Sequence, residues 1–155
     1  MTISEDGLKD LAAQDCPTPW IVLLTLSHPT LSTPMCFSSD SIDTLSNGVM
    51  YHAFPFEIVL PDDADGRTPQ ATLRVDNASQ EVVAVIRAMT SPPQLDIRVV
   101  RAAAPDLVER QWLGFEWRAS TYDVSYITGT LTIDDMAQEE FPYITFDGRF
   151  KALWP

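Results

Sequence analysis

The sequence predicts a mainly β protein: a β-sandwich or a partly closed barrel with one flanking helix. About eight or nine short segments are apolar runs or alternate apolar with polar residues, a pattern typical of strands. Only residues 78–90 repeat apolar side chains at helical spacing over enough length for a substantial helix. The chain has 12 prolines and 6 glycines, and proline is disfavoured inside helices and central strands. This composition favours short extended segments joined by loops of fixed shape.

Length and charge narrow the class of protein. A chain of 155 residues fits one domain and can bury enough surface to fold without a disulfide or a metal. The net charge is −12, from 22 acidic against 10 basic residues. This balance argues against sequence-specific nucleic-acid binding and against binding to an anionic membrane. Met1–Asp6 shows no signal peptide, and the longest apolar run, Ile21–Leu24, is far too short to span a membrane.

Residues 1–18 are expected to form an N-terminal arm, and residues 19–155 a single domain. Ser4 can cap a short helix that extends to Gln14, with acidic residues in its first turn. The apolar residues that would share one face of this helix are Leu8, Leu11 and Ala12. The arm would then lie across the domain or against a neighbouring subunit.

The first half of the domain contains several predicted strands. Residues 20–26 form an apolar run that is expected to be buried on both faces, and residues 33–40 form a more polar strand. A connector over residues 42–48 ends in Asn-Gly, a dipeptide that favours a tight hairpin. The next extended segment, from Val49, should break at Pro55 or lie at a sheet edge, because proline has no N–H to donate.

The second half centres on a predicted antiparallel hairpin between residues 113–119 and 127–133. Side chains on a strand alternate between faces, so each segment should carry one apolar row. The rows are Leu113, Phe115, Trp117 and Ala119 on the first segment, and Ile127, Leu131 and Ile133 on the second. Residues 71–75 and 95–102 are also expected to be strands, the latter with Leu95, Ile97 and Val99 inward.

Residue chemistry gives no catalytic or metal site. The cysteines and histidines, Cys16, Cys36, His28 and His52, lack the close pairing of zinc ligands. Cys36 lies between Met35 and Phe37, which predicts an inert, buried thiol. The acidic loop at Asp62, Asp63 and Asp65 does not match a calcium loop, because Pro61 and Thr72 stand at its first and twelfth ligand positions. We therefore expect no enzyme activity, no cofactor and no metal.

Five aromatic residues stand beside loops or at the end of the chain. They are Phe54, Phe56, Phe141, Phe150 and Trp154. One interpretation is that these side chains close the core of the domain. The other is that some of them form a subunit interface, where aromatic residues are enriched. We take four of them, Phe54, Phe56, Phe150 and Trp154, as a candidate subunit interface.

Several short strings follow one another between Trp20 and the C-terminus. They are His28-Pro29, Tyr51 with Phe54-Pro55-Phe56-Glu57, Leu60-Pro61, Val75-Asp76-Asn77, Ile86-Arg87, Tyr122-Asp123, Gly129-Thr130-Leu131 and Glu140-Phe141-Pro142. Their order resembles a family of uncharacterised tail-module proteins from siphophages and prophages. Members of that family often end in an aromatic-Pro-Gly-Leu-Phe tail, from which Phe150-Lys-Ala-Leu-Trp-Pro155 departs.

The resemblance implies a structural protein of the phage tail tip, with the β-sandwich and flanking helix of tail-tube proteins. It implies a ring-forming distal or minor tail protein, located in the virion after assembly in the bacterial cytoplasm. The expected partners are further copies in a ring, with a hexamer favoured over a trimer, and the tail tube, hub and tape-measure proteins. DNA would only pass through. The alternatives are a monomeric carbohydrate- or receptor-binding β-sandwich, and a cell-wall enzyme built on Cys36 and His52.

Overall fold

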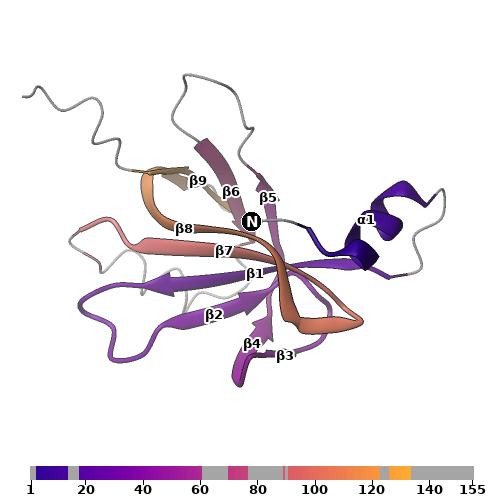
Figure 1. Ribbon diagram of the computed structural model, residues 1–155. Coiled ribbons are helices and arrows are strands. Elements are labelled where there is room, and N and C mark those ends of the chain that lie inside the picture. The colour runs from indigo at the N-terminus through magenta and orange to yellow at the C-terminus, as the bar shows by residue number, and fades with distance from the viewer. Residues whose placement is uncertain are drawn as a thin grey trace, which may run out of the picture.

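The protein is mainly β, as predicted, with a short helix at its N-terminal end (Figure 1). The computed structural model describes residues 3–13, 18–60, 70–76, 89, 91–122 and 126–133. Within these ranges the helix is α1 (Glu5–Ala12). The strands are β1 (Trp20–Ser27), β2 (Met35–Ser38), β3 (Thr44–Ser46), β4 (Val49–Ala53), β5 (Phe56–Val59), β6 (Gln70–Asp76), β7 (Gln94–Arg101), β8 (Ala104–Tyr122) and β9 (Tyr126–Thr132). The helix expected over residues 78–90 lies outside the described residues, apart from Met89.

The strands form a single mixed sheet of nine strands in the order β3-β4-β2-β1-β7-β8-β9-β6-β5. Neighbouring strands are antiparallel except for β2 and β4, which are parallel. β1 pairs with β7 along its full length, from Trp20 opposite Arg101 to Ser27 opposite Gln94. The predicted central hairpin is confirmed, since β8 and β9 are antiparallel neighbours.

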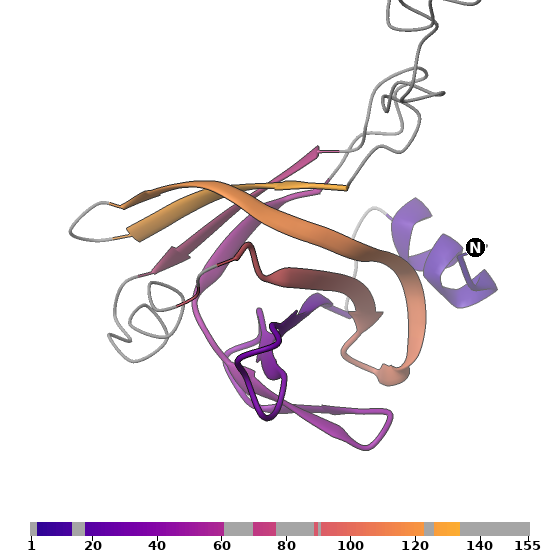
Figure 2. The same cartoon turned by 90° about the vertical axis from the view of Figure 1, so that its left-hand side faces the viewer.

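The long strand β8 lets the sheet fold over on itself. Its first part pairs with β7 and its last part with β9, and Glu116 has a partner in both strands. Figure 2 shows β8 curving from the lower layer of the sheet into the upper one. The main core lies between the layers and is built from Leu24, Leu26, Ala71, Leu73, Val75, Leu95, Ile97, Phe115, Trp117, Ile127 and Leu131. The two layers are continuous through β8, as in the partly closed barrel alternative.

The dipeptide Phe54-Pro55 crosses from one end of the strand order to the other. It joins β4, next to the terminal strand β3, to β5, the opposite terminal strand. The Phe54 N–H donates to the Ser38 carbonyl at 3.0 Å, and the Pro55 carbonyl accepts from the Asp76 N–H at 3.2 Å. The predicted break at Pro55 is confirmed. The two hydrogen bonds of this dipeptide connect the two layers.

The β3–β4 hairpin covers the other face of β1 and β7. Tyr51 of β4 packs in a second cluster with Ile21, Leu23 and Val100. The prediction that the first apolar run is buried on both faces is therefore confirmed. β3 itself lies where only a connector was expected. The turn is at Asn47 and Gly48 as predicted, with φ of 48° and 78°, a conformation that asparagine and glycine tolerate.

A bulge in β8 places Leu113 on the surface and not in the predicted apolar row. Leu95 pairs with Phe115 and Ile97 with Trp112, so β8 has one residue more than β7 between these pairs. Gly114 takes φ 74° at the bulge, where only glycine is unstrained. The extra residue reverses the alternation, so Leu113 is 49% exposed although Phe115 and Trp117 are buried. The prediction for Leu113 is wrong, and the side chain of Ala119 is outside the described part.

Candidate functional site

Phe54 and Phe56, two of the four predicted interface residues, lie on either side of the crossover at Pro55. Both are half-buried and pack against the main core. The ring of Phe54 lies 5.0 Å from that of Phe37, measured between centroids, at an angle of 46°. Phe54 therefore helps to close the open end of the core, while Phe56 also borders the surface. Phe150 and Trp154 lie outside the described residues.

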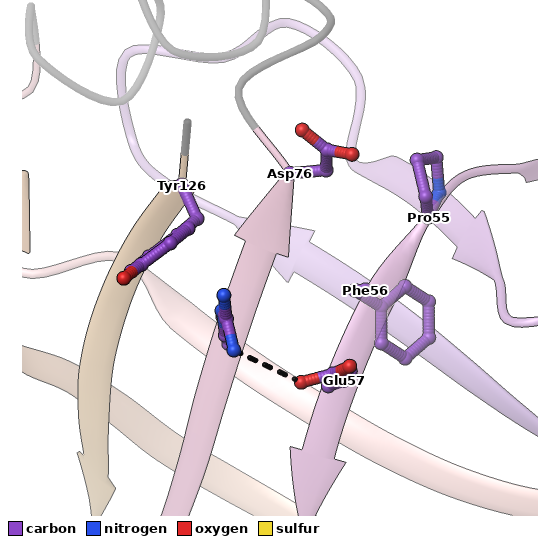
Figure 3. A pocket seen from close by; sticks show the side chains of 6 residues that line it. Pro55, Phe56, Glu57, Asp76 and Tyr126 are labelled. Atoms are coloured by element: carbon purple, nitrogen blue, oxygen red, sulfur yellow. Dashed lines mark ion pairs between the residues drawn. The ribbon is translucent and has the colours of Figure 1, made fainter. Parts of the chain in front are cut away.

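A surface groove of about 480 Å³ begins at Phe56. Its walls come from three neighbouring strands and consist of Pro55, Phe56, Glu57, Arg74, Asp76 and Tyr126 (Figure 3). Arg74 lies opposite Glu57 in the β5–β6 register and forms an ion pair with it at 3.5 Å. The Arg74 guanidinium also sits 3.7 Å above the centre of the Tyr126 ring, a favourable cation–π contact.

The chemistry of this groove suits an amphipathic partner. Glu57 offsets the charge of Arg74 and Asp76 adds a further carboxylate, so the groove offers no excess positive charge for an anion. Phe56 and Tyr126 supply aromatic surface beside these polar groups. Such a lining fits an apolar or aromatic side chain of another protein, or a sugar ring. Val59, on the same terminal strand β5, is 69% exposed.

A second open cavity, of about 460 Å³, surrounds His28 and Ser91. Nε2 of His28 lies 2.7 Å from Oγ of Ser91. The backbone N–H of Thr30 donates to Nδ1 of the same ring at 3.2 Å. Nδ1 also lies 2.6 Å from Oγ1 of Thr30. The ring therefore links Thr30, just after β1, to Ser91.

The soft ligands and acids do not converge in the part of the chain that the structure describes. No group of three or more His, Cys, Asp or Glu side chains there is placed to hold a metal. Cys36 is half-buried, and burial raises the pKa of its thiol although Thr25 and the charge of Arg98 act in the opposite direction. The thiol is therefore mainly protonated, although Cys36 is less buried than predicted. Nδ1 of His52 lies 3.2 Å from a carboxylate oxygen of Asp43 at the surface.

Two of the candidate sites from the sequence cannot be placed. Cys16 and the acidic loop at Asp62, Asp63 and Asp65 lie outside the described residues.

Among the helices that the structure describes, none has the length and apolar character to cross a membrane.

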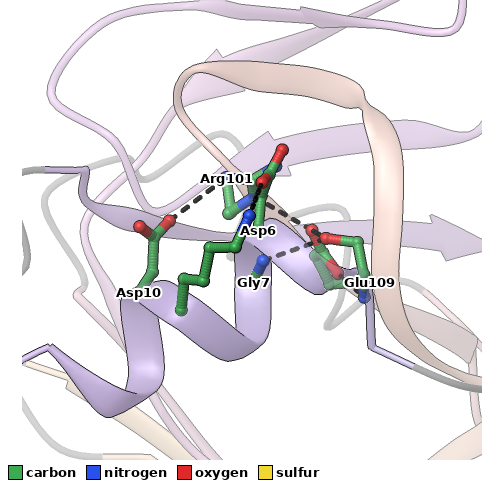
Figure 4. A network of polar contacts seen from close by, with 7 residues as sticks. Asp6, Gly7, Asp10, Arg101 and Glu109 are labelled. Carbon is green, nitrogen blue, oxygen red and sulfur yellow. Dashed lines mark hydrogen bonds and ion pairs between the residues drawn. The ribbon is translucent and has the colours of Figure 1, made fainter.

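A buried polar network attaches α1 to the β domain, and the sequence did not reveal it (Figure 4). Glu109, only 2% exposed, accepts from Ser4 at both carboxylate oxygens: from its N–H at 2.8 Å and from its hydroxyl at 2.6 Å. Nε of Arg101 donates to the same carboxylate at 2.9 Å, and Nη1 donates to Asp10 at 3.2 Å. Gly7 allows this approach, since a Cβ there would lie 2.9 Å from Oε2 of Glu109.

The network holds Glu109 in its charged form. Burial alone would raise the pKa of Glu109, but the hydrogen bonds from Ser4 and Arg101 and the charge of Arg101 together lower it below its ordinary value. Hydrogen bonds to Asp10 and Glu109 raise the pKa of Arg101 despite its burial. The predicted cap at Ser4 is confirmed, because Oγ of Ser4 also accepts from the N–H of Gly7 at 3.0 Å.

The fold and these surfaces define a small mainly β domain with an attached N-terminal helix. A family model matches residues 7–146. The chain therefore belongs to DUF1833, a domain of unknown function. A search of curated proteins gives no match to the chain.

Proposed function

We propose that this protein is a structural component of a siphophage or prophage tail tip, a ring-forming adaptor between the tail tube and the hub. The ordered strings between Trp20 and the C-terminus resemble such tail-module proteins. The mainly β class agrees with the fold that this resemblance implies. The role requires that copies of the chain join side by side, so the support must come from the surfaces of the domain.

The observation that carries the proposal is that the sheet, in the part of the chain that the structure describes, ends in two strands that each lack a strand partner on one edge. β3 and β5 are its terminal strands, and each has one edge without a strand partner among the described residues. Unpaired backbone groups on an edge strand are ready to pair with another chain. Two different edges on one subunit permit head-to-tail contacts, which close into a ring when the rotation between copies is suitable.

The acidic charge supports the second part of the proposal, a channel through which DNA passes. A net charge of −12 repels a polyanion. Acidic side chains facing the lumen of the ring would keep DNA from adhering during ejection. Particles in which several lumen-facing acids are replaced by lysine should eject DNA more slowly, and unchanged ejection kinetics would contradict the channel role.

The proposed location is tested on purified phage particles. Mass spectrometry should detect the protein in particles, with the tail-tube protein as the positive control. Immunogold electron microscopy should place the label at the distal end of the tail. If the protein is absent from particles that contain a complete tail tube, the proposed role is wrong.

A second candidate function is a monomeric carbohydrate- or receptor-binding module, which the groove beside β5 favours. Aromatic surface at Phe56 and Tyr126 next to charged groups is typical of sugar-binding sites. A glycan array would test it, with Tyr126→Ala as the matched variant. Binding by the wild type that Tyr126→Ala abolishes, from a protein that stays monomeric, would favour this function over the ring.

A further inference from the structure

Among the described residues, the groove beside β5 combines aromatic surface with one carboxylate that has no cationic partner. Phe56 and Tyr126 supply the aromatic surface (Figure 3). Arg74 is already paired with Glu57 at 3.5 Å, whereas no described residue forms an ion pair or a hydrogen bond with the side chain of Asp76. The described lining therefore carries a net negative charge. It suits a partner in which positive charge accompanies an apolar side chain.

Positive charge is scarce in this protein, and two of its basic residues flank one aromatic side chain. Only 10 of the 155 residues are Lys or Arg. Arg149 and Lys151 stand on either side of Phe150, and no other aromatic residue of the sequence has a basic residue on each side. This segment, which lies outside the described residues, therefore has the chemistry that complements the groove.

The chain is long enough to bring Phe150 to the groove of the same subunit. β9 begins at Tyr126, which lines the groove, and its 7 residues carry the chain about 20 Å away from it. Ile133, just after β9, packs against the main core. From there to Phe150 the extended chain can span more than about 50 Å. The return to the groove is therefore well within reach.

We propose that Phe150 binds in the groove beside β5 of its own chain. Its ring covers the aromatic surface of the groove and removes that surface from water. Its basic neighbours, Arg149 and Lys151, lie beside the carboxylates of the groove and set the orientation of the segment. A tethered segment has an effective concentration on the order of millimolar, which favours the groove of the same chain over that of a neighbour.

The bound segment makes the groove a site that the chain itself occupies. The aromatic surface that a sugar ring would need, at Phe56 and Tyr126, is the surface that Phe150 covers. A ligand of the groove must therefore displace Phe150 before it binds. Phe56 and Phe150, both predicted at a subunit interface, then meet within one subunit. The contact does not depend on the proposed ring or on a place in a phage tail.

Photo-crosslinking in the full chain tests the contact. p-Benzoylphenylalanine in place of Phe150 should crosslink within the monomer to peptides that contain Phe56, Arg74 or Tyr126, as identified by mass spectrometry. The same group in place of Phe141 is the matched control, because Phe141 has no basic neighbour, and it should not label the groove. The inference is overturned if the crosslinks from position 150 join two copies, fall outside the groove, or do not form. Equal labelling of the groove from position 141 also overturns it.

A charge reversal gives a second test with the same readout. Asp76→Lys should lose most of the crosslink from position 150, because it places a like charge beside Arg149 and Lys151. Adding Arg149→Glu and Lys151→Glu to this variant should restore the crosslink. Val59→Lys is the matched control, since Val59 is exposed on the same strand β5 but does not line the groove.

Circular dichroism confirms that each of these variants is folded. Val59→Lys should keep the crosslink at the level of the protein without this substitution. If Asp76→Lys keeps it as well, or if the reversed charges on the segment do not restore it, the proposed contact is wrong.

Discussion

The interior of the sheet and the attachment of α1 are held by opposite kinds of interaction. The interior between the layers consists of aliphatic and aromatic side chains such as Leu73 and Phe115. The attachment consists of Ser4, Arg101 and Glu109, joined by directed hydrogen bonds. Apolar burial is non-directional and tolerates small rearrangements. A buried polar network depends on every partner, because each lost hydrogen bond leaves an unpaired polar group.

This contrast predicts that the interior determines global stability and that the network determines only whether α1 stays docked. Substitutions in the interior should lower the free energy of unfolding of the whole domain. Substitutions in the network should release the helix from an otherwise intact sheet. Four experiments test this division, beginning with the substitution that should change stability most.

Phe115→Ala should have the largest effect. Phe115 is 0% exposed, and removing its ring leaves a cavity between the layers. We expect the free energy of unfolding, measured with denaturant, to fall by about 3–5 kcal/mol. Leu113→Ala, two residues away but exposed, is the matched control and should change it by less than about 0.5 kcal/mol. Similar losses for the two variants would contradict the bulge at Gly114.

Gly129→Ala should come next. A Cβ on Gly129 would lie 1.6 Å from Nε1 of Trp117, which is itself buried without a hydrogen-bond acceptor in the described part of the chain. The Trp117 ring must move, so the free energy of unfolding should fall by about 1–3 kcal/mol. Near-UV circular dichroism should report the displaced indole. Gly114→Ala has open space around it and only backbone strain, so it should leave the near-UV spectrum unchanged.

Glu109→Gln should release α1 with little effect on the sheet. The variant removes the charge that pairs with Arg101 and weakens the acceptor for Ser4. We expect hydrogen-exchange protection of the α1 amides to fall by about tenfold or more, while the β7 amides keep theirs. Glu57→Gln, at an exposed ion pair with Arg74, is the control. Unchanged protection in α1 would show that the network is not what docks the helix.

Acid should release α1 in the same way. The pKa of Glu109 is lowered in the folded protein, so its contribution is present above the unfolded value of about 4.3 and is lost as pH falls through the lower, folded value. The Gly7 amide resonance, followed by NMR, should shift as α1 undocks in this acid range. Asp6 and Asp10 also face Arg101. In Glu109→Gln, where α1 is already released, the Gly7 resonance should stay near its undocked position throughout this range. An identical titration in that variant would exclude Glu109 as the cause.

Local patterns predicted the fold class and most strands. Alternation and apolar runs identified β1, β6, β7 and the β8–β9 hairpin, and Asn47-Gly48 identified a tight turn. The bulge in β8 was missed because Gly114 looked like an ordinary strand residue, although one inserted residue reverses every side chain beyond it. β3 was missed because its three residues carry no pattern, and its place depends on contacts with β8.

The candidate sites were less predictable, because they depend on residues far apart in the sequence. Ser4 and Glu109 are separated by 105 positions, and nothing near either residue indicates that they bind each other. The only local signal was Gly7, an unfavourable residue in a helix, which is explained by its close approach to Glu109. The prediction for the aromatic residues did not separate core from surface positions. Side-chain type alone does not distinguish Phe54, which closes the core, from Phe56, which borders the groove.

The crossover at Phe54-Pro55 joins the two layers at a second place, apart from β8. Its backbone is bonded to Ser38 in one layer and to Asp76 in the other. Separating the two layers would therefore require breaking the hydrogen bonds of this dipeptide. A domain built in this way would resist sliding of one layer over the other without needing a disulfide.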